Sequence, residues 1–180
     1  IFATAVLRNC TNSRKAIRAI EEAIGAPVNL LSARDEAHLS FTGASCDRAI
    51  EKGTVVDLGG GSTELTRVEE GRDFDDVSIG QGSLSSYAGY VEFVMPQADE
   101  VEAIERAFLE RVAETPVDLR KYRAETLYGV GGSARAAAKL YAQMTGESCR
   151  PKTLTPEHFD ALLDLLENNP SKFAHLAARA

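Results

Sequence analysis

Apolar residues recur along this chain with two periods, one typical of helices and one typical of strands. Segment 13–24 carries isoleucines three to four positions apart, which predicts an amphipathic helix, and Gly25 can end it. Segment 98–113 repeats this spacing and predicts a second, acidic helix. Three apolar runs separated by glycine turns predict an antiparallel meander, with strands at 54–58, 62–68 and 74–79.

The rest of the chain predicts shorter elements around this meander. Ser32 can cap a helix over 35–42, and Gly43 can end it. We expect a polar loop at 44–53 and a connector rich in glycine and serine at 80–89. Residues 1–6 are expected to be a strand or the end of one. Further strands are expected at 28–31 and 126–130, and further helices at 134–144, 156–167 and 171–179. This order predicts a mixed α/β domain with helices packed on a sheet.

The turn between the first two strands of the meander is the first candidate for chemistry. Two acids, Asp57 and Glu64, flank it, and it consists of Gly59, Gly60, Gly61 and Ser62. Glycine lets backbone N–H groups approach an anion, and successive N–H groups in a turn form an anion-binding nest. A carboxylate beside such a turn can hold Mg²⁺ directly or through water. A hairpin turn that is merely rich in glycine does not require both acids, so we interpret the segment as phosphate-binding.

A second glycine turn follows the strand expected at 126–130. Gly131, Gly132 and Ser133 lead there into an alanine-rich helix. A helix N-terminus presents free N–H groups and a partial positive charge, so it can also bind phosphate. The alternative is a tight strand-to-helix turn with Ser133 as an ordinary N-cap. The first glycine turn on the same predicted sheet favours phosphate binding.

Composition limits the classes of function. The 180 residues suffice for one domain with a core, and no apolar run has the length of a membrane span. A net charge of −7 argues against nucleic-acid binding, which usually requires a basic patch. The three cysteines are far apart and match neither a disulfide framework nor a metal motif, so we expect a cytoplasmic protein. Because the first residue is Ile1 and not methionine, we expect a piece of a longer protein.

Four segments, in this order, resemble the exopolyphosphatase/guanosine pentaphosphate phosphohydrolase family. They are ATAVLRN at 3–9, LLSARDEAHLSFTGA at 30–44, VVDLGGGSTEL at 55–65 and GVGGSARA at 129–136. The resemblance implies an actin-like (ribonuclease H-like) ATPase-superfamily fold with the active site in a cleft between two domains. Residues 1–43 would be the end of the first domain and the crossover helix, and residues 44–180 a C-terminally incomplete second domain. The family's other phosphate loop, an Asp-x-Gly-Ser-Asn motif, does not occur in this sequence.

The resemblance also implies roles for individual residues. Glu36 aligns with the second acid of the family's Glu-Glu-Ala motif and is the candidate general base that activates water. Asp35, the preceding acid, is expected to have a surface or supporting role. Asp57 and Glu64 are the candidate ligands of Mg²⁺. Phosphate would bind to the two glycine turns and to Arg8, which resembles the family's motif arginine.

The activity implied by the resemblance is hydrolysis of a phosphoanhydride. A Mg²⁺-dependent enzyme, which can be a homodimer, would release the terminal phosphate of inorganic polyphosphate or of guanosine pentaphosphate. We expect these 180 residues alone to be inactive, because they supply half of the cleft. One alternative is an actin-like ATP-binding module of the sugar-kinase or Hsp70 type, against which the acid motif RDEAHL at 34–39 argues. The other is a non-catalytic binding domain.

No catalytic role is expected for the remaining polar and aromatic residues. The histidines lack the spacing of metal ligands and are expected to be structural or exposed: His38, His158 and His175. Three aromatic residues are expected in the core: Tyr87, Tyr90 and Phe93. The run RKYRAE at 120–125 is expected to form a solvated face.

Overall fold

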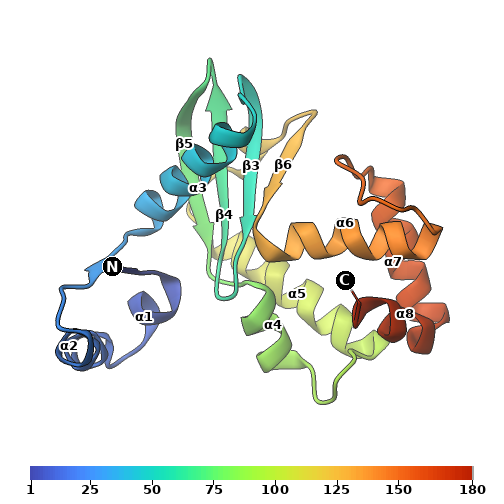
Figure 1. The fold of residues 1–180 in the computed structure, drawn as a ribbon, viewed down its shortest axis with the longest axis horizontal. Helices are drawn as coiled ribbons and strands as arrows, with labels where there is room; N and C mark the ends of the chain where they lie inside the picture. Colours follow the sequence, from blue (N-terminus) through green and yellow to red (C-terminus); the bar gives the residue numbers. More distant parts are fainter. Residues whose placement is uncertain (180) are drawn as a thin grey trace.

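Figure 1 shows the chain as a computed structural model, which describes residues 1–179 and leaves out the side chain of Asp47. A four-stranded sheet lies at its centre, in the order β5-β4-β3-β6. The strands are β3 (Lys52–Leu58), β4 (Thr63–Glu69), β5 (Arg72–Ile79) and β6 (Leu127–Val130). Strand β4 runs antiparallel to β3 and β5, which confirms the predicted meander, and β6 runs parallel to β3.

Helices and a small second sheet surround the central sheet. Strands β1 (Phe2–Ala3) and β2 (Asn29–Leu30) pair in parallel. The α-helices are α1 (Ala5–Asn9), α2 (Ser13–Ile24), α3 (Ala33–Asp47), α4 (Ser83–Tyr90), α5 (Ala98–Glu114), α6 (Gly131–Thr145), α7 (Pro156–Asn168) and α8 (Pro170–Ala177). A 3₁₀ helix, η1 (Leu119–Tyr122), follows α5. In Figure 1, α1 and α2 lie on one side of the central sheet and α6, α7 and α8 on the other.

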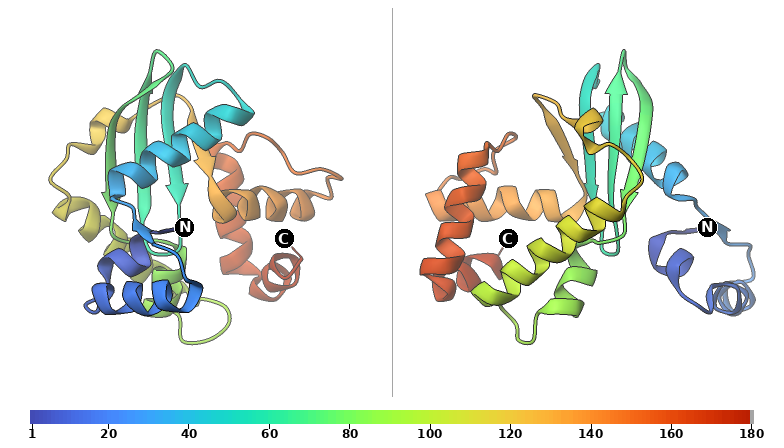
Figure 2. Two further views of the ribbon diagram at one scale, coloured as in Figure 1. Left: turned by 60° about the vertical axis from the view of Figure 1, so that its left-hand side comes forward. Right: turned by 180° about the vertical axis from the view of Figure 1, so that it is seen from behind.

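Both faces of the central sheet are covered (Figure 2). On one face, Phe41 of α3 packs against Val55 of β3 in the buried core. On the other face, the buried Thr54 hydroxyl donates a hydrogen bond of 2.7 Å to the carbonyl oxygen of Tyr122 in η1. Neighbouring residues of a strand point to opposite faces, so α3 and η1 enclose the sheet between them. The mixed α/β fold expected from the sequence is therefore confirmed.

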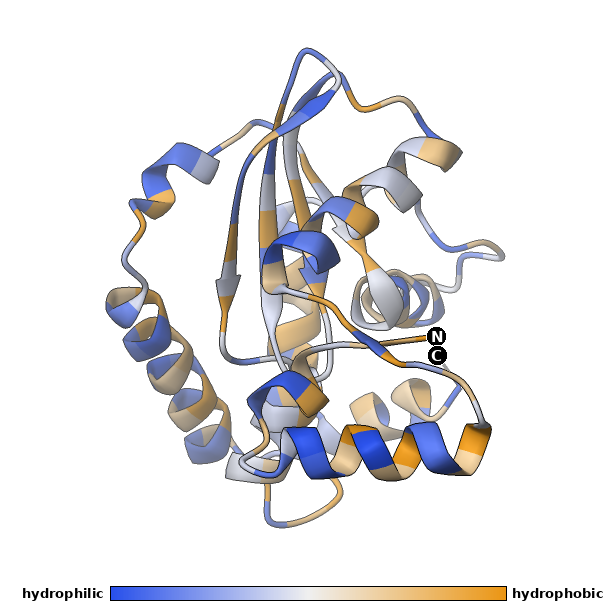
Figure 3. Ribbon diagram, turned by 90° about the vertical axis from the view of Figure 1, so that its left-hand side faces the viewer, coloured by the Kyte–Doolittle hydropathy of each residue, from blue (hydrophilic) through white to orange (hydrophobic). Residues whose placement is uncertain are grey.

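The two amphipathic helices expected from the spacing of apolar residues are present. Helix α2 has the predicted bounds, and Gly25 ends it in the left-handed conformation, with a φ of 68°. Helix α5 covers its predicted segment and ends at Glu114. Figure 3 shows hydrophilic and hydrophobic residues mixed along both helices, while hydrophobic residues recur in the strands between them.

Helix α3 is longer than predicted. It continues through Gly43 to Asp47, so the polar loop expected at 44–53 is short, and β3 already begins at Lys52. A glycine costs a helix interior only about 1 kcal/mol. Phe41 and Ala44 pack against the core from either side of Gly43, and this burial outweighs the cost.

Four other local predictions differ from the structure. The connector expected at 80–89 contains helix α4, whose N-terminus is capped when the Ser85 hydroxyl accepts a 2.9 Å hydrogen bond from the Gly82 N–H. The strand expected at 1–6 covers only two residues, because α1 begins at Ala5. The run at 120–125 is not fully solvated, since Tyr122 is buried. The aromatic residues assigned to the core lie at the surface, with exposed fractions of 45%, 39% and 67% for Tyr87, Tyr90 and Phe93.

Replacing Gly43 by Ala is expected to stabilise the fold by about 0.5–1 kcal/mol, because alanine restricts the unfolded chain and favours the helix. A Cβ atom at this position would meet no heavy atom within 4 Å. Urea unfolding of both proteins measures the difference. The matched control is Gly25→Ala, which should destabilise the fold, since φ at Gly25 is +68°. A destabilising Gly43→Ala would contradict the account of α3.

Candidate active site

The first glycine turn joins β3 to β4 and is held from one side by α4. The Gly59 N–H donates to the Ser62 carbonyl across the turn, at 3.0 Å. The N–H groups of Ser83 and Ser85, in the first turn of α4, donate to the carbonyls of Gly59 and Gly60 at 2.8 and 2.9 Å. The carbonyl oxygens are thus bonded to the protein. No described residue accepts a hydrogen bond from the N–H groups of Gly60, Gly61 or Ser62, so these groups can bind an anion.

Gly82, which the sequence analysis did not single out, allows α4 to approach the turn. A Cβ atom on Gly82 would lie 2.5 Å from the Gly59 carbonyl oxygen and 2.7 Å from the Ser62 nitrogen. Both are backbone atoms that cannot rotate away. The Gly-Gln-Gly segment directly after β5 could have indicated this close approach, but we interpreted it only as part of a connector.

The second glycine turn lies at the same end of the sheet. Strand β6 is parallel to β3 with Val130 opposite Asp57, so the following residue, Gly131, comes beside the Asp57 carboxylate. The Cβ atom that Gly131 lacks would stand 3.1 Å from Asp57 Oδ1, and its φ of +92° suits glycine. The Ser133 hydroxyl donates to the Leu58 carbonyl at 3.3 Å. Helix α6 begins at Gly131 and not after Ser133, so its first N–H groups belong to the glycine turn itself.

The two candidate metal ligands face each other across the hairpin. Asp57 on β3 pairs with Glu64 on β4, so both side chains lie on the face of the sheet that α3 covers. Asp57 accepts a short hydrogen bond from the Ser40 hydroxyl of α3. Glu64, only 2% exposed, accepts a 2.8 Å hydrogen bond from the Ser78 hydroxyl. Ser40 and Ser78 therefore orient the two carboxylates, a role that the sequence pattern does not reveal.

The carboxylates form an electrostatic group. Burial raises the pKa of Glu64, and the charges of Glu36 and Asp57 raise it further, while hydrogen bonds from Ser62 and Ser78 oppose the shift. A cation beside Asp57 and Glu64 would offset both the desolvation and the repulsion. The described residues contain no group of three or more histidine, cysteine or acidic side chains arranged around one metal position. Two carboxylates still suit Mg²⁺, which usually keeps several waters and takes one or two carboxylates.

Glu36 lies in the first turn of α3, where Ser32 caps the helix as predicted. Asp35 completes this cap, since its carboxylate accepts a 3.1 Å hydrogen bond from the Ser32 N–H. Arg8 of α1 donates to Glu36 Oε2 at 2.9 Å and to the Leu31 carbonyl at 2.8 Å. Arg8 is therefore paired with the candidate base, whereas the sequence analysis placed it on phosphate.

The spacing of Glu36 and Ser40 connects the base to the metal ligands. The two residues are four positions apart, so they share one face of α3, and Ser40 contacts Asp57 directly. The loop also reaches α1, because a Cβ atom on Gly61 would lie 3.8 Å from Val6. The structure thus brings Arg8, Glu36, the two acids and both glycine turns to one end of the sheet.

A sequence profile of one protein family, the Ppx/GppA phosphatase family, matches residues 1–177. The chain belongs to the Ppx/GppA phosphatase family. Membership makes it a relative of phosphatases, and hydrolysis of a phosphate-containing substrate is the chemistry that the family name describes. The order of the glycine turns and the acid motif in the sequence had indicated the same family.

Solved structures related to the Ppx/GppA family have the same fold. An exopolyphosphatase from Cytophaga hutchinsonii aligns over 92% of this chain and 55% of its own, with a TM-score of 0.75 and 20% identity. A type II variant of the Ppx/GppA phosphatase from Aquifex aeolicus aligns over 93% of this chain and 55% of its own, with a TM-score of 0.60 and 20% identity. An exopolyphosphatase-like protein aligns over 82% of this chain and 47% of its own, with a TM-score of 0.66 and 26% identity.

The chain spans about half the length of these solved structures. Their likeness confirms the actin-like fold that the resemblance implied, with a mixed sheet flanked by helices. Among the described residues, no helix is both long enough and apolar enough to cross a bilayer.

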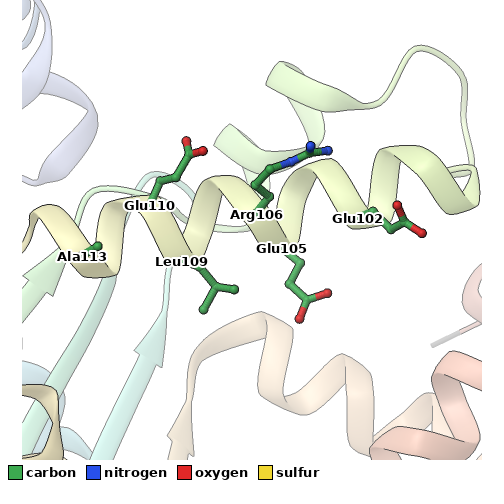
Figure 4. A pocket seen from close by; sticks show the side chains of 6 residues that line it. All are labelled: Glu102, Glu105, Arg106, Leu109, Glu110 and Ala113. Atoms are coloured by element: carbon green, nitrogen blue, oxygen red, sulfur yellow. The ribbon is translucent and has the colours of Figure 1, made fainter.

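Three other polar features have no part in the candidate site. A hollow along α5 is lined by three glutamates and one arginine, which would repel a phosphate polyanion (Figure 4): Glu102, Glu105, Arg106, Leu109, Glu110 and Ala113. His38 is exposed and pairs with Asp73 at 2.7 Å. His158 stacks on Tyr141 with ring centroids 4.2 Å apart.

Proposed function

We propose that the chain carries half of the active site of a Mg²⁺-dependent phosphoanhydride hydrolase, which releases the terminal phosphate of inorganic polyphosphate or guanosine pentaphosphate. The observation that supports this most is the set of unpaired N–H groups in the first glycine turn, beside Glu36 and two further carboxylates. A terminal phosphate bound by these N–H groups would lie within the group of acids that can activate water and hold a metal. The family match supports a phosphatase of this class.

Glu36 is the proposed general base. Its Oε2 atom is held by Arg8, while its Oε1 atom accepts no hydrogen bond from a described residue. Fixing one oxygen orients the carboxylate, and the other can then accept the proton of a water molecule that attacks the terminal phosphorus. The N–H groups of the two glycine turns would stabilise the charge on the phosphate oxygens, because those of the first turn donate to no described residue and are available to an anion.

Asp57 and Glu64 are the proposed ligands of Mg²⁺. When bound, the ion would neutralise charge on the phosphate chain. Ser40 and Ser78 keep the two carboxylates in position through their hydroxyl groups. Burial, and then the charges of Glu36 and Asp57, raise the pKa of Glu64, so the site is more favourable with a cation than without one.

The affinity for Mg²⁺ is expected to depend on pH through Glu64. Its folded pKa is raised above the ordinary 4.5, so between 4.5 and the raised value the folded chain holds a proton that the unfolded chain has released. Without metal, ionisation of Glu64 therefore costs stability as pH rises through this window. Mg²⁺ must displace the proton, so its apparent affinity should fall about tenfold per pH unit below the raised pKa.

Isothermal titration with Mg²⁺ at several pH values measures this dependence. Glu64→Gln should remove it, bind Mg²⁺ more weakly, and make the metal-free chain more stable at neutral pH than the wild type. Little difference in stability is expected near pH 4, where the glutamate is protonated in both states. If the Mg²⁺ affinity changes neither with pH nor with Glu64→Gln, Glu64 is not a ligand of the metal.

The division into domains and the remaining properties also belong to this proposal. Residues 1–43 would end the first actin-like domain, and residues 44–180 would form most of the second. The proposed protein is cytoplasmic, consistent with three cysteines that are free thiols.

Phosphate release tests the whole proposal. It should occur with Mg²⁺ in a longer version of the protein that adds a domain with the family's other phosphate loop, the Asp-x-Gly-Ser-Asn motif. It should not occur with the 180 residues alone. Long-chain polyphosphate and guanosine pentaphosphate, offered side by side, identify the substrate; no release from either would refute the hydrolase.

A further inference from the structure

A groove with positive charge lies at the end of the sheet opposite the glycine turns. We call it the basic groove, and the start of β3, the end of β4, and the end of η1 with the segment that follows it form the groove. Its lining residues are Lys52, Gly53, Thr54, Arg67, Val68, Glu69, Lys121, Arg123, Ala124, Glu125 and Thr126. Four of these side chains are cations and two are carboxylates, on a chain whose net charge is −7.

The cations of the basic groove are poorly neutralised. None of Lys52, Lys121 and Arg123 forms an ion pair with another residue in the part of the chain that is described. Arg67 reaches Glu69 only at 3.6 Å. The Arg67 Nε atom is buried without a hydrogen-bond acceptor, and its guanidinium lies 4.5 Å from the Phe74 ring centroid. A buried donor without an acceptor costs free energy. The rest of the Arg67 side chain is partly exposed and lines the groove, where its guanidinium could donate to an anion.

Two further groups border the groove. Asp75 is opposite Arg67 in the β4–β5 ladder and offsets part of its charge. Tyr122 lies between Lys121 and Arg123 and is 4% exposed, and its hydroxyl makes no hydrogen bond of normal geometry. Burial, followed by the charges of Asp75 and Asp76, raises the Tyr122 pKa to about 12. The hydroxyl therefore remains a neutral donor at physiological pH.

The basic groove is separate from the candidate active site. Strand β3 spans the sheet from Lys52, at the groove, to Leu58, at the first glycine turn. At about 3.3 Å per residue this separation is roughly 20 Å. In Figure 1 the turn between β3 and β4 is at the lower end of the sheet and the start of β3 is at the upper end.

We propose that the basic groove binds an oligophosphate anion. Two guanidinium and two ammonium groups from three segments surround the groove, so they match several negative charges better than a single one. Guanidinium groups bind phosphate oxygens in pairs, and an ammonium group adds a point charge. The anion has two potential sources, a free short oligophosphate or the distal part of a long chain whose end lies at the glycine turns. Only the second source rests on the proposed function.

Calorimetric titration of the 180-residue chain with sodium tripolyphosphate, without Mg²⁺ and at low ionic strength, tests the site. The double variant Lys52→Ala/Lys121→Ala should lose at least about tenfold in affinity, since it removes two of four cations. The matched control, Lys152→Ala/Lys172→Ala, removes the same charge from exposed positions elsewhere and should bind like the wild type. Circular dichroism confirms that each variant is folded.

A second titration with long-chain polyphosphate separates the two sources. If tripolyphosphate distinguishes the wild type from the groove variant, the groove holds a free short anion. If only the long chain distinguishes them, the groove holds the distal part of that chain. The proposal is wrong if the wild type and the groove variant bind both anions with equal affinity. It is also wrong if the control variant Lys152→Ala/Lys172→Ala loses as much affinity as the groove variant. These titrations measure binding and not turnover, so neither result decides whether the protein is a hydrolase. Phosphate release tests that proposal separately.

Discussion

Replacing Glu36 by Gln is expected to lower the rate of phosphate release by a factor of about 10²–10⁴, the usual contribution of a general base. Glutamine keeps the shape of the side chain and can accept the hydrogen bond that Arg8 donates at 2.9 Å. It cannot take a proton from water at neutral pH. The loss should therefore appear in kcat, while KM changes little, because the glycine turns that would bind phosphate are untouched.

The assay uses a version of the protein that supplies both halves of the cleft, with Mg²⁺ and whichever substrate is hydrolysed. The matched control is Glu22→Gln, an exposed glutamate of α2 that forms no ion pair within the described chain. Thermal unfolding checks that both variants fold. Wild-type release by Glu36→Gln would exclude Glu36 as the base and favour a binding role for these 180 residues, with the base in the other half of the cleft. A rise in KM with constant kcat would make it a substrate contact.

The central part of the site could be predicted from the sequence, because its residues lie close together along the chain or directly after predicted strands. The first glycine turn lies directly between two strands, so Asp57 and Glu64 must pair across the hairpin once the turn forms. The second glycine turn reaches the same end of the sheet because β6 is parallel to β3. Periodicity indicates that each strand exists, and the expected sheet brings their ends together.

Contacts between distant segments could not be predicted in this way. Arg8 and Glu36 are separated by 28 positions, and their ion pair depends on how α1 lies against the start of α3. The burial of Glu64 depends on α3 and on Ser78 of β5, so its sequence neighbours give no hint of it. Tyr122 was misplaced for the same reason: charged residues flank it, but η1 turns its ring toward the sheet.

Helix α4 shows how a packing constraint can look like a flexible connector. Its glycines and serines have low helix propensity, and the sequence therefore indicates a loop. In the structure these residues contact the first glycine turn. The N–H groups of Ser83 and Ser85 donate to its carbonyls, and the missing side chain of Gly82 lets α4 lie close enough for these bonds. Small residues are thus required here by the close approach of α4 to the first glycine turn and not by flexibility.

Replacing Gly82 by Ala is accordingly expected to be the most damaging change of a single methyl group near the site. The added Cβ would lie 2.5 Å from the Gly59 carbonyl oxygen, 2.7 Å from the Gly60 carbonyl carbon and 2.7 Å from the Ser62 nitrogen. Because all three are backbone atoms, the turn and α4 must separate. We expect a loss of about 3 kcal/mol, the upper part of the range for overpacked interiors. For a chain of this size it corresponds to a fall in Tm of roughly 6–12 °C.

Gly89→Ala is the matched control for this prediction, since it adds the same methyl group to the same helix. A Cβ atom at Gly89 would meet nothing within 4 Å, so the change should be neutral or stabilise the fold by up to about 1 kcal/mol. Scanning calorimetry of the two variants separates steric conflict at the turn from a general effect on α4. If Gly82→Ala unfolds at the wild-type temperature, α4 does not hold the turn as closely as described. The hydrogen bonds from Ser83 and Ser85 would then not be what fixes the conformation of the turn.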